Sequence, residues 1–238
     1  MSFIYLIRHA QAGTRDNYDV LSELGHEQAR LLGEHFARQG IELSTVITGS
    51  MRRQQHTAEI ACAAMSQAGM PSPEIIADER WNEFSLISIY RAIAKRLIEE
   101  STDFARDYEE MLEALRRDPH TVGGATGRCD FQIVRAWMEN RYPEYEGESW
   151  AVFRSRIERC AAELTNHKSE RAIAIFTSAT PIAITAGAAL GLSDEKLLSI
   201  LGVLYNTGMT IVRARGEGIR LFTLNSTPHL PPALQTLR

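Results

Sequence analysis

The chain of 238 residues has little cysteine, no excess of positive charge and no long apolar run. Its three cysteines lie far apart and form no Cys-x-x-Cys pair, the spacing typical of zinc and redox sites. A formal net charge of -4 gives no basic surface for extended nucleic-acid binding. No apolar run approaches the roughly 20 residues of a membrane span, and residues 1–7 lack the basic start of a signal peptide. We therefore expect reduced thiols and a cytoplasmic location, with neither nucleic acid nor membrane as a partner.

Short apolar runs alternate with amphipathic segments, without internal repeats or low-complexity tracts. Strands are predicted at 3–7, 45–48, 75–77, 172–176, 209–212 and 219–224, the last two as a hairpin. Outside the middle of the chain, helices are predicted at 22–36, 51–65, 149–166 and from Pro181 onwards. This order is typical of an α/β fold with a three-layer, doubly wound, mainly parallel sheet and helices on both faces.

The middle of the chain, residues 85–148, is charged and helix-forming and lacks strand signals. Helices are predicted there at 89–100, 103–116 and 130–141, and the glycine-rich stretch 119–127 is predicted to be a flexible loop. The last ten residues, which are rich in proline, are predicted to be a surface tail. We interpret 1–238 as a single α/β domain in which 85–148 forms a mainly helical cap insertion.

Four of the predicted strands end at polar residues that together offer two guanidinium groups, an imidazole and a carboxyl group. They are, in chain order, Arg8 and His9 after the first strand, the turn from Ser50 to Arg53 after the second, Glu83 after the third and Ser178 after the fourth. Open parallel sheets bind ligands at the carboxyl ends of their strands, so we expect these side chains to converge there. Arginine presents a planar set of donors that matches phosphate oxygens. A phosphorylated ligand is therefore expected at this edge of the sheet.

These residues also resemble a known family. The stretch Leu6–Gln11 resembles the Arg-His-Gly motif of the histidine phosphatase superfamily, also called phosphoglycerate-mutase-like, and 21–29 resembles its next block. Residues 49–59 are similar to the block Ser-x-x-x-Arg-x-x-x-Thr-Ala, whose Thr-Ala end places the second arginine at Arg53 rather than at Arg52. The resemblance covers most of the chain, although 85–148 matches only loosely.

The resemblance implies a phosphoric monoester hydrolase that needs no metal or other cofactor. In this scheme His9 attacks the phosphoryl group and forms a phosphohistidine, while Arg8 and Arg53 bind its oxygens. Glu83 stands where many members keep the proton donor, and the same carboxylate would then activate the water that hydrolyses the phosphoenzyme. The implied substrate is a phosphorylated small molecule or a phosphopeptide.

Two positions depart from the family pattern. Ala10 replaces the glycine that follows the histidine, which is tolerable where φ is negative. Ser178 stands where the family has a second pocket histidine, and as a phosphate ligand it offers one shorter hydrogen-bond donor that carries no charge. Two alternatives therefore stand beside the phosphatase: a degenerate phosphate-binding module of the same fold and, less favoured, a phosphoglycerate-type mutase, because 85–148 does not resemble the mutase insertion.

His56 lies three residues after Arg53 and is a candidate replacement for the missing histidine. A packing or solvent role is favoured for it, and Arg52 is predicted to face solvent or form a salt bridge. The other histidines are predicted to be structural or exposed: His26, His35, His120, His167 and His229.

Overall fold

The computed structural model describes residues 3–71, 73–119, 121–166, 171–215 and 218–237, and the chain divides into two compact units. The first unit consists of residues 1–83 and 156–238, and the second of residues 84–155. The segment 85–148 lies within the second unit, and its role as a cap stays a prediction.

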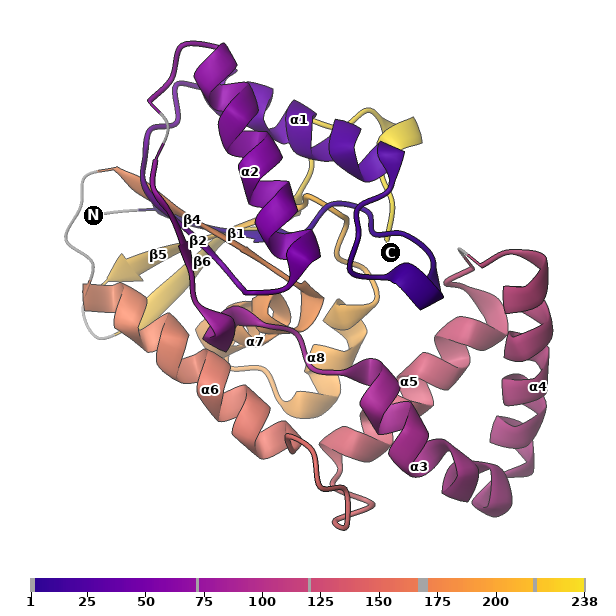
Figure 1. Ribbon diagram of the computed structural model, residues 1–238. Helices are drawn as coiled ribbons and strands as arrows, with labels where there is room; N and C mark the ends of the chain where they lie inside the picture. The colour runs from indigo at the N-terminus through magenta and orange to yellow at the C-terminus, as the bar shows by residue number, and fades with distance from the viewer. Residues whose placement is uncertain (1–2, 72, 120, 167–170, 216–217, 238) are drawn as a thin grey trace. The chain divides into compact units, whose positions relative to one another are not determined.

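A mixed sheet of six strands forms the centre of the first unit, in the order β3-β2-β4-β1-β5-β6 (Figure 1). The strands are β1 (Phe3–Arg8), β2 (Leu43–Thr48), β3 (Ile75–Ala77), β4 (Ala172–Thr177), β5 (Met209–Arg215) and β6 (Gly218–Ser226). The first four are mutually parallel, and β5 and β6 add an antiparallel hairpin at one edge. The predicted α/β class with a mainly parallel sheet is confirmed, while residues 216–217 of the hairpin turn, predicted at 215–218, lie outside the described residues.

The central strands β1 and β4 are apolar on both faces because helices cover both sides of the sheet. Ile4, Leu6 and Ile7 of β1 are at most 1% exposed, which is typical of strands in parallel sheets. In the parallel register of the two strands Arg8 lies opposite Thr177. The segments that follow β1 and β4 therefore leave the sheet at the same edge, next to each other.

The helices α1 (Glu23–Arg38) and α2 (Arg52–Gln67) cover one face of the sheet, and α7 (Ala179–Leu190) covers the other, with α8 (Asp194–Leu201) next to it (Figure 1). Ser22 caps α1 as predicted, because its hydroxyl accepts a hydrogen bond from the amide of Gly25 at 3.0 Å. Gly33 lets α1 approach α2 closely, since a Cβ there would lie 2.1 Å from the carbonyl oxygen of Ala61. The position of α2 is thereby fixed by backbone contact.

The second unit contains α3 (Leu86–Glu100), α4 (Thr102–Arg117) and α5 (Gly124–Met138), and α6 (Trp150–Glu163) continues from it into the first unit. The predicted helical character is confirmed. The predicted loop 119–127 is wrong in its second half, because α5 begins at Gly124. Ala125 and Thr126 are buried, and this packing outweighs the low helix propensity of the neighbouring glycines.

The prediction of a C-terminal surface tail is right in part, because residues 231–237 lie at the surface but hydrogen bonds anchor them. The amide group of Gln28, in α1, donates to the carbonyl oxygen of Leu234 at 2.7 Å and to the hydroxyl of Thr236 at 2.9 Å. The backbone of Asn206 donates to the carbonyl oxygen of Thr236 at 2.8 Å. Since Gln28 and Asn206 are fully buried, their polar groups require partners, and the C-terminal segment supplies them.

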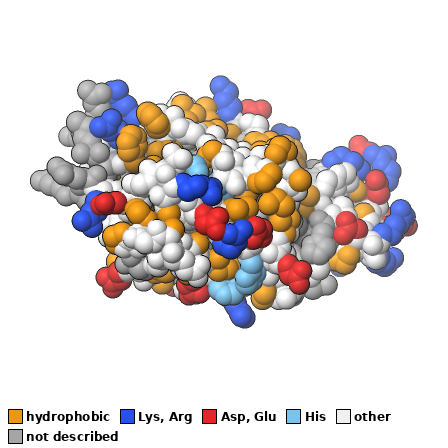
Figure 2. All heavy atoms as spheres, turned by 90° about the horizontal axis from the view of Figure 1, so that it is seen from above, with side chains coloured by type: hydrophobic (Ala, Val, Ile, Leu, Met, Phe, Trp, Pro, Cys, Tyr) orange, Lys and Arg blue, Asp and Glu red, His pale blue; other side chains and the backbone are white. Residues whose placement is uncertain are grey.

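The surface over α1 and α2 carries charges of both signs. Figure 2, viewed from above Figure 1, shows Lys and Arg side chains beside Asp and Glu side chains, with hydrophobic ones scattered between them. On α1, Arg30 pairs with Glu27 and Glu34, which are one helical turn away in opposite directions. Among the helices that the structure describes, none is long and apolar enough to cross a membrane.

The three cysteines, Cys62, Cys129 and Cys160, are buried free thiols, as predicted. Burial raises the pKa of Cys62 to about 11, so this side chain stays protonated and is a poor nucleophile near neutral pH. The cysteines therefore act as small packing residues.

Candidate functional site

The carboxyl end of β1 brings Arg8 and His9 into the interior, where they are 6% and 1% exposed. The amide of His9 donates to the carbonyl oxygen of Thr177 at 2.8 Å. On the other side, the side chain of Asn206 donates to the carbonyl oxygen of His9 at 3.0 Å, and the amide of Thr207 donates to that of Arg8, also at 3.0 Å. The backbone of this dipeptide is therefore fixed from two directions.

The imidazole of His9 is held in one tautomer. Its Nδ1 lies 2.8 Å from the carbonyl oxygen of Ala10, which accepts only, so Nδ1 carries the proton and Nε2 carries the lone pair. Burial, followed by the positive charges of Arg53 and Arg8, holds the pKa of His9 well below its usual value. The side chain is thus a neutral imidazole with Nε2 as its nucleophilic atom.

The alanine that replaces the family's glycine fits without strain. The residues other than glycine that have positive φ in the described chain are Asn140, Thr207 and Asn225, so Ala10 is not among them. The amide of Ala10 donates to the hydroxyl of Thr57 at 3.0 Å, and that hydroxyl donates to the carbonyl oxygen of Arg53 at 2.6 Å. Thr57 therefore joins the loop after β1 to the first turn of α2.

The guanidinium of Arg8 is held by the backbone. Its Nη1 donates to the carbonyl oxygen of Leu204 and, at 2.8 Å, to that of Leu237. Its Nε is buried and has no hydrogen-bond partner within the described part of the chain. A buried donor without a partner is uncommon, and here it is available to an anion.

Arg53 reaches His9 from α2. Its Nε lies 3.2 Å from Nε2 of His9, and its Nη1 lies 2.9 Å from Oδ1 of Asp19. The ring of Tyr18 lies 4.9 Å from the guanidinium carbon. Arg52 is exposed, as predicted. The sequence reasoning missed Tyr18 and Asp19, because they lie in an irregular loop where periodicity carries no signal.

Ser178 lies at the N-terminus of α7 and is 1% exposed. The side-chain nitrogen Nε2 of Gln54, from α2, donates to the Ser178 hydroxyl oxygen at 2.9 Å. Because Gln54 is the donor, the hydroxyl proton of Ser178 remains available for another acceptor. Gln54 is a further residue that the sequence reasoning missed, although it immediately follows Arg53.

Glu83 lies next to the same helix N-terminus. One of its carboxylate oxygens, Oε2, accepts a hydrogen bond from the amide of Thr180 at 3.0 Å, two residues beyond Ser178. This bond fixes the Glu83 carboxyl group against the first turn of α7. The structure thus places Arg8, Arg53 and His9 in one cluster. Glu83 lies beside Ser178, and the bond from Gln54 connects Ser178 to α2, the helix that carries Arg53.

His56 packs against α1, where its ring centroid lies 5.2 Å from that of His26. His229 is buried, and its Nε2 lies 2.9 Å from the hydroxyl of Thr207. Burial, together with the positive charges of His35 and Arg38, lowers the pKa of His229 to about 3. His120 and His167 lie outside the described residues.

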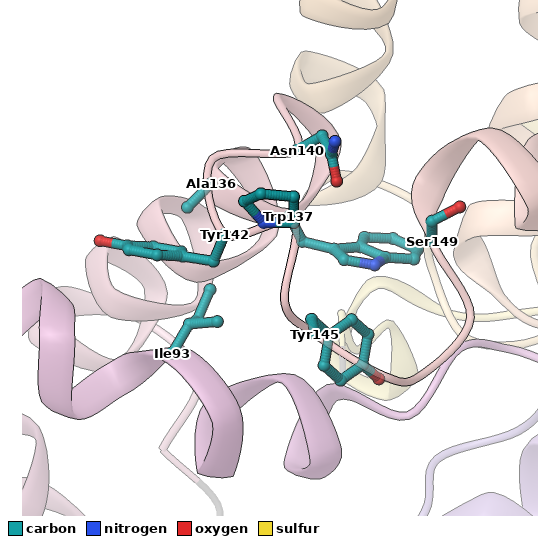
Figure 3. A pocket seen from close by; sticks show the side chains of 8 residues that line it. Ile93, Ala136, Trp137, Asn140, Tyr142, Tyr145 and Ser149 are labelled. Carbon is teal, nitrogen blue, oxygen red and sulfur yellow. The ribbon is translucent and has the colours of Figure 1, made fainter.

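A separate small cavity lies within residues 84–155 and has a volume of about 50 Å³. Figure 3 shows its labelled side chains, from α3, from α5 and from the segment after α5: Ile93, Ala136, Trp137, Asn140, Tyr142, Tyr145 and Ser149. Ligand pockets usually measure roughly 300–1,000 Å³. This cavity has room for a water or two, and it is not a candidate site for a metabolite.

An Arg-His pair at the carboxyl end of the central strand, facing a second arginine from α2, defines a class of phosphate-handling proteins. The model of the histidine phosphatase superfamily (branch 1) matches residues 4–128 and 126–227. The chain belongs to this superfamily.

Individual relatives are distant. A 2,3-bisphosphoglycerate-dependent phosphoglycerate mutase of Methylorubrum extorquens is 34% identical over 89 residues, which are 34% of this chain and 40% of that protein. The structure of a phosphoserine phosphatase from Entamoeba histolytica has a TM-score of 0.63 and 16% identity, covering 97% of this chain and 100% of that one. A mycobacterial glucosyl-3-phosphoglycerate phosphatase has a TM-score of 0.59 and 18% identity, covering 95% and 100%. These two structures share the fold of this chain.

The two hydrogen bonds of Thr57 predict that Thr57→Val destabilises the protein more than the same substitution at Thr185, which makes one of these two kinds of bond. In Thr57→Val the amide of Ala10 loses its buried acceptor, so we expect the free energy of unfolding to fall by about 1–3 kcal/mol. Thr185→Val is the matched control, because this buried threonine also donates to the carbonyl four residues earlier, at 2.9 Å. Urea denaturation should show a smaller loss for the control, and equal losses would contradict the link from Thr57 to Ala10.

The lowered pKa of His229 predicts a loss of stability in acid. The unfolded chain binds a proton at this residue below about pH 6.5, whereas the folded chain does so only near pH 3. The free energy of unfolding should therefore fall by about 1.4 kcal/mol per pH unit as the pH decreases between these values. We expect a slope shallower by this amount in His229→Gln, measured by urea denaturation. A parental slope in His229→Gln would contradict the assignment.

Proposed function

We propose that the protein is a phosphatase that hydrolyses a phosphomonoester through a phosphohistidine on His9, without a metal. The observation that carries this proposal is the neutral imidazole of His9, whose Nε2 lone pair is next to the Arg53 guanidinium in a buried setting. A neutral Nε2 is the form that attacks phosphorus, and neighbouring guanidinium groups stabilise the charge of the transferred phosphoryl group.

The first step forms a bond between Nε2 of His9 and phosphorus and breaks the bond from phosphorus to the ester oxygen. Arg8, through Nε, and Arg53 donate to the oxygens of the phosphoryl group. Glu83 in its acid form gives a proton to the leaving oxygen, so the product departs as an alcohol. The carboxylate that remains is the base of the second step.

In the second step a water molecule attacks the phosphohistidine and loses a proton to Glu83. The bond from phosphorus to Nε2 breaks, inorganic phosphate leaves, and both His9 and Glu83 return to their starting states. The Ser178 hydroxyl, whose proton Gln54 leaves available, donates to the phosphoryl group in both steps.

The substrate class that we propose is a small phosphomonoester, with a phosphopeptide as the second choice. The two structural neighbours are phosphatases of phosphoserine and of glucosyl-3-phosphoglycerate, both of which are phosphomonoesters. Because both are less than 20% identical to this chain, we infer from them only the class of substrate and no particular compound.

A phosphate-binding module without efficient turnover is the second candidate. Ser178 supports it, because a hydroxyl in place of an imidazolium removes a cationic donor from the pocket. This candidate keeps the same ligand and the same arginines, and it differs from the phosphatase in the rate of phosphoryl transfer. The mutase alternative has the support of one relative that matches 34% of this chain.

Replacement of His9 should abolish turnover. In His9→Ala we expect hydrolysis of p-nitrophenyl phosphate to fall at least about 10³-fold, because the nucleophile is gone. The exposed His26 provides the control His26→Ala, which should keep parental activity, and EDTA should affect neither protein. An acid-labile label on His9 after mixing with radioactive substrate would exclude the module, whereas binding of phosphate without label or turnover would exclude the phosphatase.

Loss of the Ser178 hydroxyl should lower kcat more than it raises KM. A donor that points at the charge of the transition state is worth about 10²–10³-fold in kcat, so Ser178→Ala should fall within this range. Ser44→Ala is a suitable control, because the Ser44 hydroxyl donates to the carbonyl oxygen of Ala172 near the start of β4. Unchanged kcat in Ser178→Ala would show that this hydroxyl makes no contact with the phosphoryl group.

A further inference from the structure

The loop between β1 and α1 packs two side chains against Arg53. Oδ1 of Asp19 lies 2.9 Å from Nη1 of Arg53; the Asp19 side chain is 54% exposed and that of Arg53 is 8% exposed. The Tyr18 ring lies under the guanidinium and also meets the ring of His9 edge-on, with 5.9 Å between centroids. A surface loop thus contacts both the arginine and the histidine of the site.

Two of the three nitrogens of the Arg53 guanidinium bond to different residues. Nε donates to His9 and Nη1 donates to Asp19. The N–H of Nε and one N–H of Nη2 point in the same direction, and together they form an edge that binds the oxygens of an anion. Asp19 therefore holds the one nitrogen outside this edge and leaves the edge facing His9, where Nε would exchange its bond to His9 for one to a phosphate oxygen.

The same carboxylate holds the helix that carries Arg53. The N-cap residue Met51 has no side-chain acceptor for the first amides of α2. Oδ2 of Asp19 accepts from the amide of Arg52 at 3.2 Å, and Oδ1 accepts from the amide of Arg53 at 3.4 Å. The guanidinium and the backbone of Arg53 are consequently tied to one group.

We propose that Asp19, with Tyr18 beneath the guanidinium, is a positioning residue that sets the phosphate-binding edge of Arg53 against Nε2 of His9. The inference rests on the proposed function, because it concerns the phosphate site of that reaction. A long arginine side chain loses rotamer freedom when it binds an anion, and Asp19 removes that freedom before the ligand arrives.

A different role for Asp19 predicts the opposite effect on phosphate affinity. An internal anion that competes with phosphate for Arg53 would weaken phosphate binding, and its removal would tighten it. The geometry favours positioning, because Asp19 contacts Nη1 rather than the edge beside His9.

The test measures binding of inorganic phosphate by isothermal titration calorimetry. We expect Asp19→Ala to raise the Kd about tenfold and Asp19→Asn to raise it less than about threefold, because the asparagine oxygen accepts from Nη1 and the amide of Arg53 and loses only the bond from the amide of Arg52. The control Glu42→Gln removes a carboxylate as exposed as that of Asp19, with 55% of its side chain exposed and 3.2 Å from Arg171, and should change the Kd less than about twofold.

A double-mutant cycle separates positioning from helix capping. In an Arg53→Ala background, Asp19→Ala should change the Kd less than about twofold, since the group through which it acts is absent. A tenfold effect in both backgrounds, or tighter binding in Asp19→Ala, would overturn the proposal. Thermal denaturation confirms that each variant is folded, and Tyr18→Leu provides a second probe of the same guanidinium, with weaker phosphate binding expected.

The outcomes for the inference and for the proposed function are distinct. Turnover by the parent together with equal phosphate affinity in Asp19→Ala would overturn the positioning role alone. Phosphate binding without turnover, weakened in Asp19→Ala, would overturn the phosphatase alone. No phosphate binding by the parent would overturn both.

Discussion

The parallel pairing of β1 with β4 is the constraint on which the rest of this site depends. Arg8 lies opposite Thr177 in the register, so the next residues of the two strands, His9 and Ser178, leave the sheet side by side. A shift of one residue would turn every side chain of β1 to the other face and break the hydrogen bond from His9 to Thr177. The apolar faces of both strands hold this register, because both are covered by helices.

The site concentrates positive charge around a histidine that carries none. Two buried guanidinium groups and the low local dielectric favour the neutral imidazole, and the Ala10 carbonyl decides which nitrogen keeps the lone pair. The same charges that keep His9 unprotonated are those that an anionic ligand would neutralise. The two arginines would therefore serve both purposes: they attract an anionic ligand, and they keep His9 in its neutral, nucleophilic form.

Segments far from the Arg-His pair in sequence keep its side chains in place. The carbonyl of Leu237 accepts from Arg8, and the side chain of Asn206 is bonded to both His9 and Thr236. Thr207, a buried β-branched residue with φ of 54°, donates its amide to the carbonyl of Arg8. Strain at such a residue persists where the surroundings over-determine it, which agrees with its place beside the site.

The sequence by itself determined the strands, most helices and the helical character of 85–148, because hydrophobic period is a local signal. Strand-end position together with the resemblance to the superfamily determined the candidate residues His9, Arg8, Arg53, Glu83 and Ser178. The sequence reasoning misjudged the start of α5 and the C-terminal segment, where buried neighbours outweighed glycine and proline. The contacts of Gln54, Tyr18 and Asp19 were decided by tertiary structure alone. Each of these contacts joins a loop or helix turn to a segment that is distant in sequence. Its free energy depends on both segments, so no local pattern in the sequence predicts it.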